Sequence, residues 1–273
     1  MRKRNLLTKK ISKQILSINN LLESYFNSLR RFILDAKRLR FDRNNKVFLV
    51  IVSVIFLTLV YFLIPTAYNK ELIQNEIKSQ IYQKHNIVVK FDNKIQYNFF
   101  PKPHYSSKNL FILNNQRNIG EVKNFKIFIN FKNFFKFNQI QTRDVILDKV
   151  DFNIKKSDLS FFINLLKTEP NRNKIKIKRS NIFFMNKNDE VLFINQINDS
   201  QFYYDLKSLK NILVLKGKVF NVPYKLTIGN DKLNKIFNFE FISKKLVLKI
   251  ENETDNKKKN DTGNLKISFK NKN

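Results

Sequence analysis

Apolar and polar residues alternate along most of the chain after residue 87. A period of two is typical of half-buried β-strands that have one apolar face and one solvated face, and such strands usually form antiparallel sheets. The sequence therefore predicts a mainly β protein with an antiparallel sheet. The clearest alternating segments are residues 87–91, 125–131, 146–154, 175–177, 182–184, 213–219, 226–228, 237–241, 246–250 and 265–269. Asparagine tolerates positive φ, so the sequence also predicts turns where it can replace the missing glycines, namely at Asn114-Asn115, Asn188-Asp189, Gly229-Asn230-Asp231 and Asn260-Asp261.

Two segments show helical spacing instead. Isoleucines recur at every fourth position from Ile73 to Ile81, which predicts an amphipathic helix over residues 69–84. Residues 157–169 begin with a serine suited to an N-cap, carry one apolar stripe and end before Pro170. Because strands resume after this second helix, we expect it to lie between two sheet segments.

Continuous hydrophobicity marks a third kind of element. Val47 to Ile64 contain no charged residue, and 18 helical residues extend roughly 27 Å, close to the thickness of a bilayer core. We expect a transmembrane helix within residues 47–67. A cleaved signal peptide is disfavoured, because residues 1–46 precede the apolar segment and Tyr68 soon follows it.

The charges before this segment indicate its orientation. Residues 1–46 contain 13 Lys or Arg and three acidic residues, and such a basic flank normally stays in the cytoplasm. Residues 11–41 have apolar positions at helical spacing. They fit an amphipathic helix on the inner leaflet about as well as a solvated helix or a disordered basic tail. The residues after the span are expected on the far side of the membrane.

The composition changes this picture little. A formal net charge of +30 would usually suggest nucleic acid or an anionic membrane. However, the abundant Lys, Asn, Ile and Phe share A/T-rich codons and only four Gly occur, so a compositional bias explains much of the charge. The predicted topology also argues against a nucleic-acid partner. The absence of cysteine excludes disulfides and thiolate chemistry.

No arrangement of residues suggests catalysis. The four glycines are isolated from one another, and no serine lies in a G-x-S-x-G context. His85 and His104 are the two histidines, and neither has a carboxylate partner at metal-ligand spacing. We therefore predict no catalytic, cofactor-binding or metal-binding residue and no enzymatic activity.

A rigid corner interrupts the strands at Phe99-Phe100-Pro101-Lys102-Pro103. Pro101 and Pro103 cannot donate ladder hydrogen bonds, so this segment belongs at a sheet edge or at a strand reversal. We expect a structural corner that reverses the chain at the membrane-proximal end of the sheet.

The order of these elements resembles the N-terminal part of the AsmA-like family of bacterial inner-membrane proteins. In that family, a membrane span and a helix lead into a strand, an aromatic segment that ends in proline, and two further strands. The corresponding elements here are residues 69–84, 87–100 with Pro101, 108–113 and 119–129, and residues 215–219 look like a recurrent family strand. The resemblance covers roughly residues 45–230.

The resemblance implies a curled sheet whose trough carries phospholipid acyl chains and serves outer-membrane lipid homeostasis or assembly. The chain would then be anchored in the bacterial inner membrane, with residues 68–250 as a periplasmic β domain. Residues 251–273 would form a polar tail with one last strand. Membrane phospholipids would be its partners, together with other envelope proteins.

Nine apolar residues are candidates to contact lipid, either in the trough or, for the corner pair, at its mouth or in the bilayer. Two other readings fit the same alternation. The apolar face is the interior of a closed sandwich, or it belongs to an assembly factor that docks envelope proteins, including in outer-membrane protein targeting. The nine candidates are Phe99, Phe100, Phe125, Ile127, Ile129, Phe131, Val150, Phe152 and Ile154.

Overall fold

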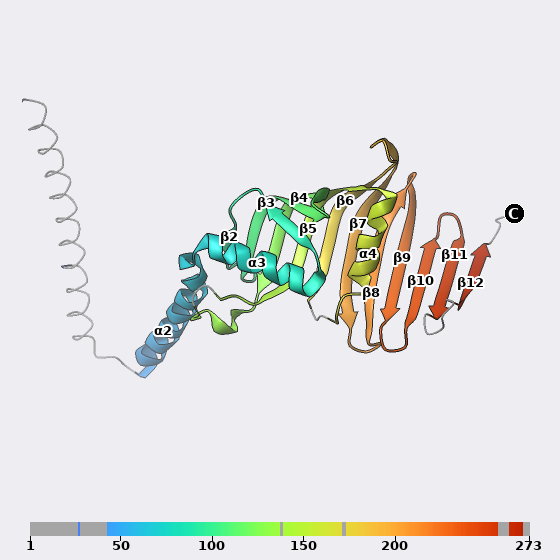
Figure 1. Cartoon of the computed structure of the whole chain (residues 1–273). Helices are drawn as coiled ribbons and strands as arrows, with labels where there is room; N and C mark the ends of the chain where they lie inside the picture. Colours follow the sequence, from blue (N-terminus) through green and yellow to red (C-terminus); the bar gives the residue numbers. More distant parts are fainter. Residues whose placement is uncertain (1–26, 28–42, 137–138, 171–172, 256–261, 270–273) are drawn as a thin grey trace, which may run out of the picture. The chain divides into compact units, whose positions relative to one another are not determined.

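The computed structural model describes residues 27, 43–136, 139–170, 173–255 and 262–269 (Figure 1). It divides into two compact units, residues 1–59 and residues 60–273. The amphipathic segment expected at residues 11–41 and the polar loop at residues 256–261 lie outside the described residues, so the predictions made for them stay predictions.

The apolar segment forms helix α2, Arg43–Leu63, which continues as a 3-10 turn, η1, over Ile64–Ala67. The most apolar 18-residue window within Lys46–Ala67 has a mean hydropathy of 3.1, and the described parts of the chain do not bury it. By length and composition, this helix can cross a membrane, as the sequence predicted for residues 47–67.

Helix α3, Lys70–His85, confirms the predicted amphipathic helix to within a residue. The Asn69 side chain caps it by accepting hydrogen bonds from two backbone N–H groups of the first turn, at 2.9 and 3.2 Å. At the other end, Asn86 takes a left-handed conformation with φ 54°, a common helix terminus. The predicted isoleucine stripe is buried, namely Ile73, Ile77 and Ile81.

The strands form one large sheet of 12 strands that is not closed, because β1 and β12 lie at opposite edges (Figure 1). The order along the sheet is β1-β3-β4-β5-β6-β7-β8-β9-β10-β11-β12, and β2 also pairs with β3. The bounds are β1 Val88–Phe91, β2 Gln96–Asn98, β3 His104–Asn114, β4 Arg117–Ile129, β5 Thr142–Ile154, β6 Ile175–Met185, β7 Val191–Asp205, β8 Lys210–Val219, β9 Val222–Asp231, β10 Ile236–Ser243, β11 Leu248–Asp255 and β12 Thr262–Phe269.

The sheet is mixed, which corrects the prediction of a purely antiparallel one. Strands β5 and β6 pair in parallel, with Val145 opposite Ile175. Parallel neighbours need a crossover connection, and here it contains a 3-10 turn, η3 (Lys156–Asp158), and helix α4 (Leu159–Leu166). The predicted helix over residues 157–169 is therefore real but shorter. Because β5 and β6 pair directly, the sheet is continuous and not divided into two segments.

A line of backbone kinks crosses the middle of the sheet. Asn109, Lys149 and Arg179 have positive φ within β3, β5 and β6, and β7 has a register shift between Ile197 and Asp199. Bulges of this kind bend strands and increase their twist. The apolar face therefore shifts by one position at each kink. Strand β7 was absent from the predicted strands, and β6 was predicted as two short pieces, because simple alternation fails across the kinks.

The predicted turns have mixed outcomes. Asn115 and Asp189 have positive φ at the turns after β3 and β6, as expected for asparagine and aspartate. The turn expected at Gly229-Asn230-Asp231 is wrong, because these residues end strand β9 and the reversal follows them, with Lys235 at positive φ.

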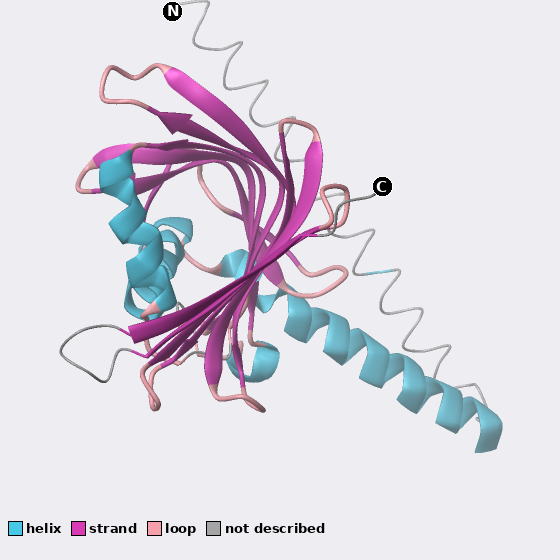
Figure 2. Cartoon of the chain, turned by 90° about the vertical axis from the view of Figure 1, so that its right-hand side faces the viewer, coloured by secondary structure: helices cyan, strands magenta, loops and turns pink. Residues whose placement is uncertain are grey.

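Helices α3 and α4 lie on the same face of the twisted sheet (Figures 1 and 2). Helix α3 covers the first strands and α4 lies over the middle of the sheet. Buried side chains of α3, β1, β3 to β6 and Phe202 of β7 form one continuous hydrophobic core, to which α4 adds Leu166. The two helices therefore decide which part of the apolar face is closed.

Candidate functional site

Four tyrosine hydroxyls join the end of the apolar helix to the sheet. Residues 60–68 belong to the same compact unit as the strands. Burial raises the pKa of Tyr68, Tyr97 and Tyr105, so these hydroxyls remain protonated donors. The bonds run from Tyr97 to the Phe62 carbonyl (2.7 Å), from Tyr105 to the Pro65 carbonyl (3.4 Å), from Tyr61 to the Phe131 carbonyl and from Tyr68 to the Phe134 carbonyl.

The loop after β4 packs on the same helix end. The ring of Phe134 is buried and stacks on Tyr61 with centroids 5.3 Å apart, while Phe131 and Phe135 are 47% and 73% exposed. Phe131 therefore begins a loop with a 3-10 turn, η2 (Phe131–Asn133), instead of continuing the strand face as predicted. Lys132 and Lys136 lie among these rings in the sequence, a composition suited to the surface of a membrane.

The proline corner lies at this end of the sheet as well. The carbonyl of Pro103 accepts a hydrogen bond from the Ile129 backbone at 3.2 Å, and the Phe100–Pro101 peptide bond is cis. Phe99 and Phe100 are 45% and 78% exposed. The corner thus connects the antiparallel strands β2 and β3, and its two aromatic rings are not in the core.

The other six predicted lipid contacts are all buried in the protein core. They pack in the cluster that contains the isoleucine stripe of α3. An acyl chain has no access to them while α3 stays in place, so the structure places no open trough over this part of the sheet. The six residues are Phe125, Ile127, Ile129, Val150, Phe152 and Ile154.

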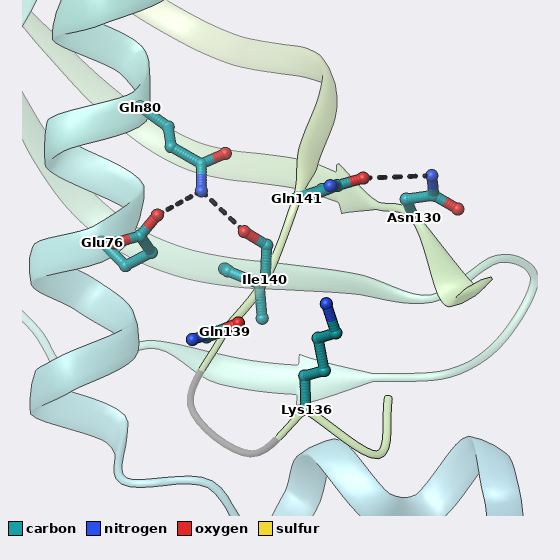
Figure 3. A pocket seen from close by; sticks show the side chains of 7 residues that line it. All are labelled: Glu76, Gln80, Asn130, Lys136, Gln139, Ile140 and Gln141. Carbon is teal, nitrogen blue, oxygen red and sulfur yellow. Dashed lines mark hydrogen bonds between the residues drawn. The ribbon is translucent and has the colours of Figure 1, made fainter. Parts of the chain in front are cut away.

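Polar contacts hold α3 over these strands (Figure 3). The Gln80 amide donates to the Ile140 carbonyl at 2.6 Å and to Glu76, while its oxygen accepts from the Thr142 backbone at 2.8 Å. Lys84 donates to the Thr142 carbonyl at 2.7 Å, and burial lowers the pKa of this lysine. The pocket of about 400 Å³ beside these groups is lined by six polar or charged residues and by Ile140. The hydrogen bonds of Gln80 and Lys84 hold α3 in place beside it.

The uncovered part of the apolar face lies farther along the sheet. The α4 carbonyl of Leu166 accepts hydrogen bonds from Asn211 and Asn230, at 3.1 and 2.9 Å, which identifies the face of β8 and β9 that looks toward the helices. By strand register, the next apolar residues on this face continue to the edge of the sheet. We call them the open apolar face, and they are Leu226, Phe239, Phe241, Leu248, Ile250, Leu265, Ile267 and Phe269.

No described helix lies over β10, β11 and β12 (Figure 1). Leu265, Ile267 and Phe269 are 60–68% exposed, and the other members of the open apolar face are half-buried or exposed. The opposite face of the same strands is polar, where Lys249 pairs with Glu251 at 2.7 Å and with Glu240 at 3.5 Å. The sheet therefore keeps one apolar and one polar face up to its edge. The sequence contained this signal in the alternation of residues 237–269, but the predicted site did not include it.

The described residues include no group of three or more His, Asp or Glu placed to hold a metal ion. His104 Nδ1 lies 2.8 Å from the Lys102 carbonyl, and the His85 ring is buried at the end of α3. Sequence comparison assigns no family or function to this chain, because no family model and no curated protein matches it. The resemblance to AsmA-like proteins therefore rests on the residues quoted above.

Burial of His85 predicts an acid-sensitive fold. Desolvation, helped by the charge of Lys84, lowers the pKa of His85 from 6.5 to about 4. The folded state thus favours the neutral His85 ring. The stability that the neutral ring contributes is complete above pH 6.5 and is lost as the pH falls from 6.5 to 4. Between pH 7 and 4.5 we expect a loss of about 2–3 kcal/mol from this group. Denaturant unfolding of the full chain and of His85→Leu at both pH values measures it. Equal pH dependence in the two proteins would contradict this assignment.

Proposed function

We propose that this protein is a non-catalytic membrane-anchored protein that holds phospholipid acyl chains on its open apolar face. Helix α2 would be the anchor, with the basic flank in the cytoplasm and the sheet on the periplasmic side of a bacterial inner membrane. The AsmA-like resemblance supports a role in outer-membrane lipid homeostasis or assembly.

The observation that carries this proposal is the open apolar face itself. Soluble proteins rarely expose contiguous apolar patches beyond a few hundred Å², and larger patches usually mark binding sites for apolar partners. Burial of a large apolar side chain contributes about 1.5–3 kcal/mol, and each methylene of a bound chain about 0.8 kcal/mol. Covering this face with an acyl chain is therefore strongly favourable.

The dimensions also suit an acyl chain. The apolar rows run across the strands, as in the row of Leu226, Phe241, Ile250 and Ile267 on β9 to β12. Three spacings between neighbouring strands give a length of about 14 Å. One leaflet of a bilayer provides about 15 Å of hydrocarbon. A row can therefore accommodate most of one lipid chain.

Native mass spectrometry of the detergent-extracted full chain tests the proposal. We expect one or a few phospholipid molecules to remain bound under activation that removes all detergent, because the apolar face shields their chains. A chain that is free of lipid at the mildest activation that removes detergent would contradict acyl-chain binding.

A second function is favoured by the edge strand. β12 is paired only with β11 among the described strands, and it carries three exposed apolar side chains. Exposed edges of this kind pair readily with strands of other proteins. On this alternative, the face docks an envelope protein and the protein is an assembly factor. Co-purification of a stoichiometric protein partner without lipid would favour it.

A further inference from the structure

A groove lies on the face of the sheet that points away from α3. Phe128 and Ile146 alternate with core residues of β4 and β5, so their side chains point to the opposite face. The groove has a volume of about 370 Å³. We call it the basic groove, and it is lined by Lys102, Pro103, Phe128, Ile129, Phe131, Arg143, Asp144, Ile146 and Lys176.

The chemistry of the basic groove combines cations with an apolar floor. Lys102, Arg143 and Lys176 contribute three positive charges, and within the described residues none of them forms an ion pair. The one carboxylate, Asp144, accepts a hydrogen bond from the Lys174 backbone at 3.0 Å. A guanidinium and ammonium groups together suit a phosphate. The aromatic and aliphatic floor suits the less polar atoms attached to it.

The position of the basic groove points to the membrane surface. Phe131 lines the groove, and its ring centroid lies 6.1 Å from that of Phe62, in the last turns of the apolar helix. Aromatic residues at the end of a membrane span normally lie at headgroup depth. Cations within a few ångströms of that level meet the phosphates of the leaflet.

We propose that the basic groove binds the phosphate of an anionic phospholipid headgroup and so holds this end of the sheet on the membrane surface. This inference rests on the membrane anchoring in the proposed function, and it is independent of acyl-chain binding by the open apolar face. Three cations against one carboxylate favour a headgroup with net negative charge. A free phosphate ion shares the recognised group and is the competing ligand.

The test compares two triple variants of the full chain in neutral detergent. Lys102→Gln/Arg143→Gln/Lys176→Gln removes the cations of the basic groove. The matched control, Lys216→Gln/Lys218→Gln/Lys225→Gln, removes three exposed lysines from the same face of the sheet. Native mass spectrometry measures the preference for phosphatidylglycerol over phosphatidylcholine, because the two lipids share acyl chains and differ in headgroup charge. Inorganic phosphate is added as a competitor.

We expect the preference for phosphatidylglycerol over phosphatidylcholine to fall at least tenfold in the groove variant and less than twofold in the control. Arg143→Gln alone should lose about threefold, which preserves the test if the triple variant folds poorly. Equal losses in both triple variants, or in neither, would overturn the proposal. Displacement of the lipid by inorganic phosphate at equal concentration would assign the groove to free phosphate instead. Variants of the open apolar face should retain less lipid in total but keep the preference for phosphatidylglycerol over phosphatidylcholine, so the two proposals fail separately.

Discussion

Replacing Leu226, Phe241 and Ile250 together by asparagine should remove most of the phospholipid that the full chain retains, at least fivefold per folded molecule. The three residues are direct cross-strand neighbours on β9, β10 and β11, so the variant places three amides in the middle of the open apolar face. An amide against an acyl chain loses its water without gaining a hydrogen bond, which costs about 1–3 kcal/mol for each side chain. Lipid extracted from the purified variant and quantified per chain provides the measurement.

The matched control lies on the opposite face of the same three strands. Thr227, Glu240 and Glu251 are also direct cross-strand neighbours, and Thr227→Asn/Glu240→Asn/Glu251→Asn makes the same number of changes. We expect this control to retain the lipid of the unmodified chain. Circular dichroism checks that both variants keep their strands. Equal lipid contents in the two variants would mean that the retained lipid belongs to the membrane helix and not to the sheet.

The second prediction with a large expected effect concerns the apolar residues of the sheet that α3 covers. Ile127→Ala should lower the free energy of unfolding by about 2–5 kcal/mol, because the Ile127 side chain is fully buried beneath α3. Ile77→Ala, on the helix side of the same core, should cost a similar amount. Neither change should alter the lipid retained per folded molecule. Denaturant unfolding and lipid extraction on the same preparations separate stability from binding.

Leu72→Ala is the control for this second prediction, because Leu72 lies on α3 but is exposed. Its effect on unfolding should stay within about 0.5 kcal/mol. If Ile127→Ala left the stability unchanged and reduced bound lipid, then β4 would line a lipid cavity and α3 would not close the core.

The period of the apolar residues was sufficient to predict the main elements. The spacing of the isoleucines predicted α3, and the long uncharged apolar segment predicted α2. Both helices are found where expected. The strands were harder to predict from the sequence wherever the backbone is kinked. At Lys149 and Arg179 the chain takes positive φ, which sequence alternation does not encode, and the apolar face changes register there.

The parallel pair of β5 and β6 shows a different limit of sequence patterns. Residues 157–169 were recognised as a helix, but a helix between two strands fits both a crossover and a boundary between two sheets. Alternation describes each strand by itself and carries no direction relative to its neighbour. Asp158 helps to fix the crossover, because its buried carboxylate accepts hydrogen bonds from Asn114 and Arg117 at the turn between β3 and β4.

The candidate site was misplaced because alternation does not show what covers a strand. We predicted lipid contacts in the longest apolar segments, such as that at Phe125 to Ile129. These segments lie in the strands that α3 buries. The isoleucine stripe of α3 was the available signal, since it needs an apolar surface close by in the chain. The alternation of residues 237–269 was the available signal for the open apolar face, but alternation alone does not show whether a helix covers these strands.

Photocrosslinking from the open apolar face tests the central claim most directly. A benzophenone amino acid in place of Phe241 would lie on this face, and the same group in place of Glu240, the preceding residue, would lie on the polar face. We predict that irradiation of the full chain in native membranes gives a phospholipid adduct at position 241 and none above background at position 240. Equal lipid adducts at both positions, or a protein adduct at position 241 in place of lipid, would contradict the account.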